Sequence, residues 1–271
     1  MSTIKFALNR TCLPHRGLAE FLALAANAGV EAVEIRNDIE GQEFADGTPA
    51  ADLRRRIEDA GLRIASVNAL QRFNDCTPAR LAEAQKLIDY AAVLGAPGIV
   101  MCPVIDARHG WSEVELETKL RHALKALAPM FRSAGVTGYV EPLGMLDSTL
   151  RQQAIAVDAI NDVDGWASFQ LCFDTFQFWR ASDTKLFSQH IGLVHVSGIS
   201  PAAKVPSAFV EPDRGLVFVD DQAETITQLR QLRTAGYEGY VSIEPFSPQV
   251  QTDPDLPAKL RASLDFISAT A

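Results

Sequence analysis

Four residues able to bind a metal ion each stand at the end of a short apolar run that is typical of a buried β-strand. The residues, with the runs they end, are Glu141 (136–141), Asp174 (169–174), His195 (191–195) and Glu244 (240–244). If these runs form neighbouring parallel strands, the four side chains emerge at one rim of the sheet. Three carboxylates and an imidazole gathered there would repel one another or remain protonated unless a cation neutralised them. The pattern therefore predicts an enzyme that binds one divalent metal ion.

This set of ligands is rich in oxygen and includes one imidazole nitrogen. It suits Mn²⁺, Co²⁺, Mg²⁺, Fe²⁺ or Zn²⁺ and differs from the thiolate sets of structural zinc sites. Four protein ligands leave two positions of an octahedral ion free for a carbonyl and an adjacent hydroxyl of a substrate. Such an ion stabilises the enediolate that forms when a neighbouring carbon loses its proton. We expect Glu141 and Glu244 to be the catalytic residues that move this proton.

A proline follows each of these two glutamates, as Glu141-Pro142 and Glu244-Pro245. Proline restricts the preceding residue to extended geometry, so it holds the glutamate in strand conformation and ends the strand directly afterwards. The matched pair supports the placement of both glutamates at strand ends.

Five glycines mark places where a helix-like stretch gives way to an apolar run. They are Gly29, Gly61, Gly95, Gly135 and Gly236. Glycine just past a helix adopts the left-handed conformation at little steric cost. The junctions therefore predict a repeated helix–turn–strand unit.

The helical stretches also carry expected start signals. These combine a capping side chain with a proline at the first helical position, or with a glutamate three residues later. They are Thr48-Pro49, Thr77-Pro78, Asp253-Pro254, Ser112 with Glu115, and Asp221 with Glu224.

Counting the apolar runs gives eight expected strands separated by helical segments. The strands lie near residues 4–8, 31–35, 63–68, 98–102, 137–141, 169–174, 191–196 and 240–244. Continuous apolar strands alternating with helices indicate a parallel sheet covered by helices. Eight repeats in 271 residues favour a closed (β/α)8 TIM barrel over an open sheet. We expect one α/β domain over 1–271, with a functional loop at 197–221.

The bulk composition excludes several classes of protein. A net charge of −9 argues against a nucleic-acid partner, because such a surface needs clustered Lys and Arg. No run resembles a signal peptide or a membrane span, so we expect a cytoplasmic protein without a membrane partner. The four cysteines have no paired spacing, which favours free thiols.

The motifs around the four residues resemble those of a known family, the xylose-isomerase-like sugar isomerase/epimerase barrels. Within that family the chain is most similar to the inosose (2-keto-myo-inositol) isomerases of inositol catabolism. The similar runs are Val140-Glu141-Pro142-Leu143-Gly144, Cys172-Phe173-Asp174-Thr175-Phe176, Val194-His195-Val196, Ser242-Ile243-Glu244-Pro245-Phe246, Val67-Asn68-Ala69-Leu70, Phe73-Asn74 and Asp213-Arg214.

The resemblance implies a metal-dependent isomerase or epimerase of a keto-polyol, with the four matching residues as ligands and the two glutamates as acid and base. It also implies that Asn68 and Arg214 bind substrate. Gln177, which we also expect to bind substrate, stands where relatives usually carry a histidine, and an amide can hydrogen-bond but cannot exchange protons near neutral pH. The segments 197–200 and 215–220 also depart from the family pattern.

Other interpretations share parts of this pattern. An inosose dehydratase-type lyase needs the same metal and base, and a non-catalytic polyol-binding barrel would explain Gln177. An endonuclease-IV-like hydrolase is disfavoured because it needs more metal ligands and a basic surface. The aromatic residues Phe176, Phe178 and Trp179 either line a sugar site or pack under a loop. The expected partner is a small polyol or sugar, and a homo-oligomer is left open.

Overall fold

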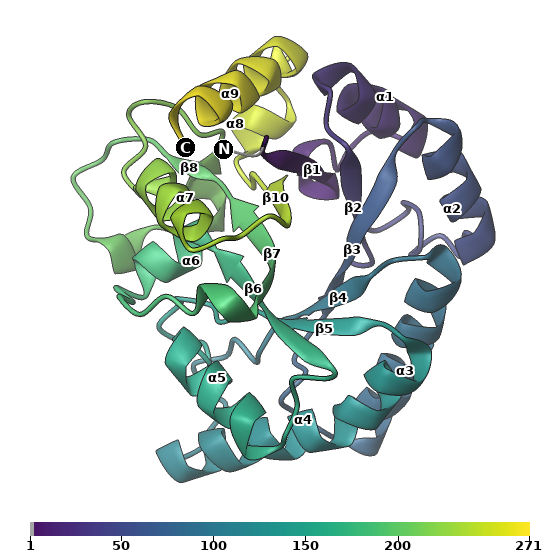
Figure 1. Cartoon of the computed structure of the whole chain (residues 1–271), viewed down its shortest axis with the longest axis vertical. Coiled ribbons are helices and arrows are strands. Elements are labelled where there is room, and N and C mark those ends of the chain that lie inside the picture. The colour runs from purple at the N-terminus through teal and green to yellow at the C-terminus, as the bar shows by residue number, and fades with distance from the viewer. Residues whose placement is uncertain (1–2) are drawn as a thin grey trace.

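A computed structural model describes residues 3–271 and shows a closed barrel of eight parallel strands. The strands surround the centre and the longer helices lie outside them (Figure 1). Around the ring the order is β1-β10-β7-β6-β5-β4-β3-β2. The strands are β1 Lys5–Asn9, β2 Ala32–Arg36, β3 Arg63–Leu70, β4 Gly98–Met101, β5 Thr137–Val140, β6 Phe169–Asp174, β7 Ile191–Val196 and β10 Tyr240–Ile243. The predicted TIM barrel is confirmed, and every expected strand lies within two residues of its observed bounds.

Helices connect the strands throughout the described part of the chain. They are α1 Leu18–Ala28, α2 Ala50–Asp59, α3 Pro78–Leu94, α4 Glu113–Ala134, α5 Gln153–Asp162, α6 Thr175–Arg180, α7 Thr225–Thr234, α8 Pro248–Gln251 and α9 Leu256–Thr270. All five junction glycines have a positive φ, between 65° and 90°. The predicted helix–turn–strand junctions are therefore confirmed.

The expected helix starts were only partly right. Thr77 caps α3, and Ser112 and Glu115 form the capping box of α4, as predicted. The other three starts were wrong, because the helices begin at Ala50, Thr225 and Leu256. At the expected start Asp221 with Glu224, the Asp221 carboxylate instead accepts hydrogen bonds from the N–H groups of Ile199 and Thr225. It therefore connects the loop after β7 to α7.

The interior of the barrel is filled by strand side chains of unequal size. Ala7, Ala32 and Ala65 form one small cluster, against which Tyr240 packs. Tyr139 belongs to a second cluster that is built mainly from strand residues. Small residues on one side thus leave room for tyrosines on the other, as expected for a packed barrel core.

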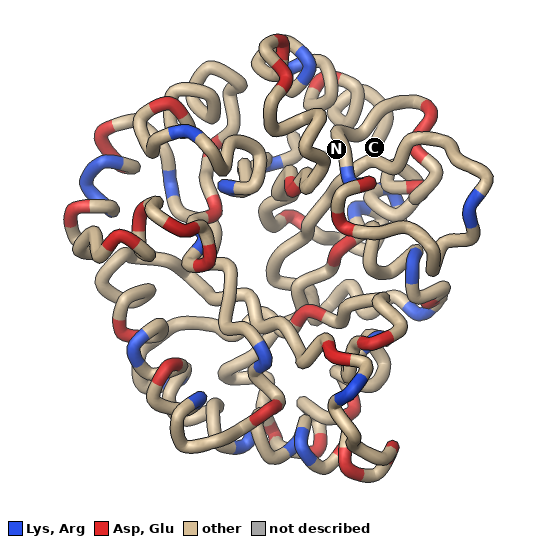
Figure 2. Tube along the Cα trace, turned by 180° about the vertical axis from the view of Figure 1, so that it is seen from behind, with Lys and Arg blue, Asp and Glu red and all other residues tan. Residues whose placement is uncertain are grey.

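Charged residues of both signs are spread along the described chain. Figure 2 shows Lys and Arg interspersed with Asp and Glu around the trace. Within 3–271, none of the helices combines the length and the hydropathy required to cross a membrane.

The loop after β7 is ordered by short elements of its own. A two-stranded antiparallel ladder joins β8 (Gly198–Ile199) to β9 (Arg214–Gly215). A side chain at Gly198 would meet the backbone of Leu216, so the close approach of the two segments requires glycine there. Phe176 is fully buried in a cluster with Phe209, and Trp179 packs beside it, so these aromatic residues pack under the loop.

Candidate metal centre

The four predicted ligands lie together at the C-terminal rim of the barrel. Glu141 and Glu244 directly follow β5 and β10, and their N–H groups donate to the carbonyls of neighbouring strands. Asp174 and His195 face each other in the register of β6 and β7. One donor atom from each residue lies within 4.8 Å of the others, and all four residues are at most 4% exposed. The predicted gathering is confirmed, while the roles of the residues remain predictions.

The orientation of His195 selects which of its nitrogens faces the cluster. Nδ1 lies 3.1 Å from Oε1 of Glu141 and 3.3 Å from Oε2 of Glu244, while Nε2 lies 3.1 Å from Oε2 of Glu34. Because an ionised carboxylate only accepts hydrogen bonds, we assign a proton on Nε2 that is donated to Glu34. Nδ1 faces the predicted ligands, so it is the nitrogen placed to bind a metal ion once its own proton has left.

Glu34 is the residue of this site that the sequence reasoning missed. It is fully buried in β2, where it accepts hydrogen bonds from the Ser66 hydroxyl and, at 3.3 Å, from the Asn9 amide. Burial by itself would raise the pKa of Glu34, but the charge and hydrogen bond of His195 outweigh it and lower the pKa to about 2. The signal was present in the sequence, because Glu34 interrupts the apolar run 32–35 and a buried charge needs a partner.

The contact with Glu34 also changes the pKa of His195. Burial lowers the pKa of its imidazole, but the surrounding acidic groups, including Glu244 and Glu34, raise it well above its usual value. In the absence of a metal ion, His195 and Glu34 therefore form a buried ion pair. A histidine held by a carboxylate on its far side is the usual arrangement behind a metal ligand.

Arg214 carries a positive charge from the long loop into the cluster. Its Nη2 atom lies 2.6 Å from Oδ2 of Asp174 and 2.8 Å from Oε2 of Glu244, and its Nε donates to the Ser197 hydroxyl at 3.0 Å. The guanidinium nitrogen thus bridges two carboxylates as a cation would. Together with the oxygen-rich donor set, this bridge shows that the residues fit a metal ion.

Glu244 is the most heavily hydrogen-bonded of the ligands. Its Oε1 atom accepts from Asn9, Asn68 and Arg36 at 3.1–3.2 Å. Burial raises its pKa to about 7, although His195 and Arg214 act in the opposite direction. Burial also raises the pKa of Asp174. In the metal-free protein, protons therefore compete with a metal ion for this site.

Gln177 bridges two segments that border the site. Its carbonyl oxygen accepts from the Gly144 N–H at 2.9 Å, and its amide donates to Glu211 at 2.9 Å. Glu211 in turn accepts a hydrogen bond of 2.6 Å from Arg214. The three expected substrate-binding residues, Asn68, Gln177 and Arg214, thus all lie at or beside the metal cluster, and their contact with substrate remains a prediction.

Two cysteines lie directly against the predicted ligands. Sγ of Cys102 lies 3.4 Å from Glu141, and Sγ of Cys172 lies 3.5 Å from Nδ1 of His195. Burial raises the pKa of both thiols well above the usual value, so they stay protonated and are poor metal ligands. The four cysteines are free, as predicted.

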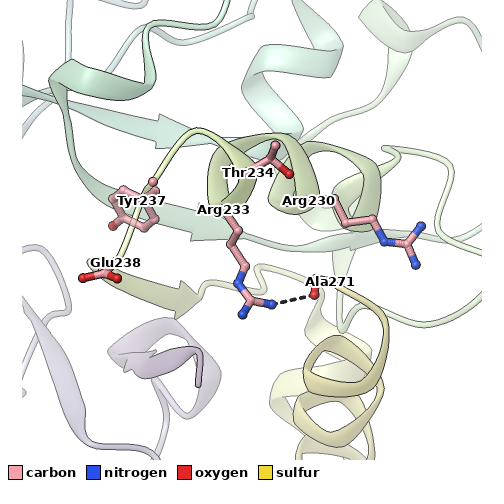
Figure 3. A pocket seen from close by; sticks show the side chains of 7 residues that line it. Arg230, Arg233, Thr234, Tyr237, Glu238 and Ala271 are labelled. Carbon is pink, nitrogen blue, oxygen red and sulfur yellow. Dashed lines mark hydrogen bonds between the residues drawn. The ribbon is translucent and has the colours of Figure 1, made fainter. Parts of the chain in front are cut away.

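A surface cavity of about 310 Å³ lies away from this cluster. Figure 3 shows its lining, where Arg233 donates a hydrogen bond of 2.6 Å to the backbone oxygen of Ala271. Tyr237, which also lines the cavity, precedes the N-terminal end of β10, whereas Glu244 follows the C-terminal end of that strand. The cavity is therefore separate from the predicted metal centre.

Comparison with known proteins places the fold in one family. Residues 22–270 match the model of the xylose isomerase-like TIM barrel family. A xylose isomerase domain-containing protein from Salmonella typhimurium LT2 has a TM-score of 0.88 and 26% identity, over 100% of this chain and 99% of that chain. No curated protein matched the chain.

Two more distant structures share the fold. The IolI protein with a bound zinc atom has a TM-score of 0.87 and 18% identity, over 99% of each chain. D-psicose 3-epimerase with D-tagatose, from Clostridium cellulolyticum H10, has a TM-score of 0.76 and 15% identity, over 98% of this chain and 99% of that chain. From the family match and the closed barrel together, this chain belongs to the xylose isomerase-like TIM barrel family.

Proposed function

We propose that the protein is a metal-dependent isomerase or epimerase of a keto-polyol, which moves a proton between neighbouring carbons through an enediolate. The observation that supports this function is the gathering of three buried carboxylates and one imidazole within 4.8 Å at the C-terminal rim of the barrel. Catalytic groups of this fold lie at that rim. The substrate class is an inosose-type polyol or a ketose sugar.

The proposed cofactor is one divalent ion held by Glu141, Asp174, Nδ1 of His195 and Glu244. Mn²⁺, Co²⁺, Mg²⁺, Fe²⁺ and Zn²⁺ all match this donor set, and zinc is the ion named with the IolI structure. When bound, the ion would polarise the substrate carbonyl and so favour loss of the neighbouring proton. For the site to load, His195 must lose the proton on Nδ1 and Arg214 must give up its bridging position.

Glu141 and Glu244 are the proposed acid and base, and their surroundings differ. Four side chains donate hydrogen bonds to Glu244, two of them arginines, whereas Glu141 contacts the Cys102 thiol and His195. Burial raises the pKa of Glu244 to about 7, which supports a role as a group that holds a proton near neutral pH. Glu141, with fewer donors, is the better placed of the two to accept a proton from carbon.

Three neighbouring side chains are proposed to bind the substrate hydroxyls. Asn68 and Arg214 already donate hydrogen bonds to Glu244, so a substrate oxygen beside that carboxylate would lie within their reach. Gln177 hydrogen-bonds to Gly144 and Glu211 rather than to Glu244, and its amide can donate a hydrogen bond to a substrate hydroxyl or accept one from it.

Exchange of substrate hydrogen with solvent deuterium tests this function. Protein loaded with Mn²⁺ is offered a series of inososes and ketohexoses, and deuterium at the carbon beside the carbonyl is measured by NMR. We expect Glu244→Gln to lower exchange at least ~100-fold while the circular dichroism spectrum is retained. The control is Glu117→Gln, because the Glu117 side chain lies on α4, is 64% exposed and pairs with Arg121 rather than with a residue of the site. Unchanged exchange in Glu244→Gln would contradict the acid/base assignment.

The same assay distinguishes the other interpretations. A dehydratase-type lyase would release a product lighter than its substrate by one water, because loss of hydroxide from the enediolate needs the same base. A barrel that only binds a polyol would show ligand binding without deuterium exchange in the metal-loaded protein.

A further inference from the structure

One buried arginine beside the metal centre lacks the partners that the other buried arginines have. Four arginines are buried in the described part of the chain, Arg10, Arg36, Arg180 and Arg214. Arg10 pairs with Glu43 at 2.5 Å, Arg36 with Asp38 at 2.6 Å and Arg214 with Asp174 at 2.6 Å.

Arg180, which is 9% exposed, forms no hydrogen bond or ion pair with any residue in 3–271, and its Nε is a buried donor without an acceptor. Its guanidinium instead lies near an aromatic ring, with Cζ 5.7 Å from the centroid of Phe176. A buried charge without a hydrogen-bonding partner is costly in free energy, so such groups are normally paired. The exception calls for a ligand that supplies the missing acceptor.

The position of Arg180 connects it to the proposed active site. It is the last residue of α6, a helix that starts directly after Asp174, and it lies on the same face as Gln177, three residues earlier. Arg214 lies over the same Phe176 ring, with its Cζ 5.2 Å from the centroid. Six residues along a helix correspond to about 9 Å, which is comparable to an extended sugar chain reaching from the metal ligands to Arg180.

Two segments that border the site lie close to Arg180. A side chain at Gly144 would lie 3.1 Å from Cβ of Arg180, so α6 packs closely on the segment after β5 only because residue 144 is glycine. The charged groups that act on Arg180 are Glu211 and Arg214 from the loop, and Asp147 and Arg151 from the segment after β5. Neither carboxylate pairs with it, and two of the four groups are themselves cations.

We propose that Arg180 binds an anionic oxygen group, a carboxylate or a phosphate, at the end of the substrate remote from the reacting carbons. This inference rests on the proposed function and narrows its substrate class from neutral polyols to acidic ketoses. Arg180 is then a specificity-determining residue, because a planar guanidinium with unused donors can bind a carboxylate or phosphate group through two parallel hydrogen bonds. The low exposure of the side chain, 9%, limits the screening of that contact by water.

The test compares three ketohexoses that differ only at carbon 6: D-fructose, D-fructuronate with a carboxylate, and D-fructose 6-phosphate. Dissociation constants are measured by titration calorimetry with Mn²⁺-loaded full-length protein. We expect one of the anionic compounds to bind at least ~10-fold more tightly than D-fructose, and the preferred one identifies the anion. Arg180→Gln should remove this preference and change the affinity for D-fructose less than ~2-fold, and Arg180→Lys should retain part of it. The control, Arg108→Gln, replaces a side chain that is 93% exposed and should change none of the three affinities.

Several results would overturn the inference. They are equal binding of neutral and anionic ketoses, absence of binding by both anionic compounds, and an anionic preference that persists in Arg180→Gln. Because binding is measured rather than turnover, tight binding of an acidic ketose without deuterium exchange would preserve this inference and refute the proposed isomerase. Conversely, exchange confined to neutral ketoses would preserve the isomerase and refute the anionic subsite.

Thermal unfolding of the ligand-free protein gives a second readout that is independent of any ligand. Arg180→Met removes an unpaired buried charge and keeps a flexible apolar side chain, so the unfolding temperature should rise. Arg10→Met is the matched control, because it leaves the buried Glu43 without its partner and should lower that temperature. A fall of the unfolding temperature in both variants would mean that Arg180 has a structural partner, and would contradict the inference.

Discussion

Replacing Glu34 by glutamine in the metal-free protein should remove one of the strongest charge interactions of the barrel. The pKa of Glu34 is about 2, against an unperturbed value of 4.5. A shift of one pKa unit corresponds to about 1.36 kcal/mol, so the ionised carboxylate contributes about 3 kcal/mol to the free energy of unfolding. Because Glu34 is fully buried, solvent does not screen this contribution.

The sign of the shift fixes the pH dependence. The pKa is lower in the folded than in the unfolded protein, so the stabilisation is complete above the unfolded pKa of 4.5 and is lost as the pH falls towards 2. We expect Glu34→Gln to be less stable than the wild type by about 3 kcal/mol near pH 6. The difference should shrink steadily below pH 4.5.

Urea unfolding in the presence of a chelator, repeated from mildly acidic to strongly acidic pH, measures this difference. Glu117→Gln is the control, because its exposed pair with Arg121 should contribute less than ~1 kcal/mol. A difference between Glu34→Gln and the wild type that stays constant with pH would refute the charge pairing of Glu34 with His195.

Further predictions concern the metal centre and the packing of α6 beside it. The affinity for Mn²⁺ should fall at least about tenfold for each pH unit below 7, because burial raises the pKa of Glu244 to about 7 and the protons on Glu244 and on Nδ1 of His195 must both leave when the ion binds; calorimetry showing a constant affinity would contradict this. Mn²⁺ at about one hundred times its dissociation constant should add about 2.7 kcal/mol to the free energy of unfolding, and Asp174→Asn should reduce that gain in the same denaturation assay. Gly144→Ala should destabilise the fold by about 1–3 kcal/mol, because the new methyl group would clash with the carbonyl oxygen of Gln177. Gly17→Ala is its control, since no atom lies within 4 Å of the added carbon, and equal unfolding midpoints in the two variants would contradict the packing argument.

The amino-acid sequence determined the barrel because its signals are local. Glycines such as Gly95 and Gly135 stop helices through their own backbone preference, whatever the rest of the chain does. Apolar runs of strand length specify buried strands, and a metal-binding residue at the end of a run is carried to the rim by the strand itself. For this reason Glu141 and Glu244, about one hundred residues apart in the sequence, were placed correctly without coordinates.

The tertiary structure alone decided which charges meet inside the barrel. Glu34 is 161 residues from His195, and no local pattern reports which buried acid holds the far nitrogen of an imidazole. The long loop likewise gave no periodicity to interpret, yet its short ladder delivers Arg214 to Asp174 and Glu244. Arg180 was indistinguishable in the sequence from any arginine at a helix end. Its burial without a partner follows from the packing of three separate segments, because Coulomb interactions and desolvation depend on distances through space rather than along the chain.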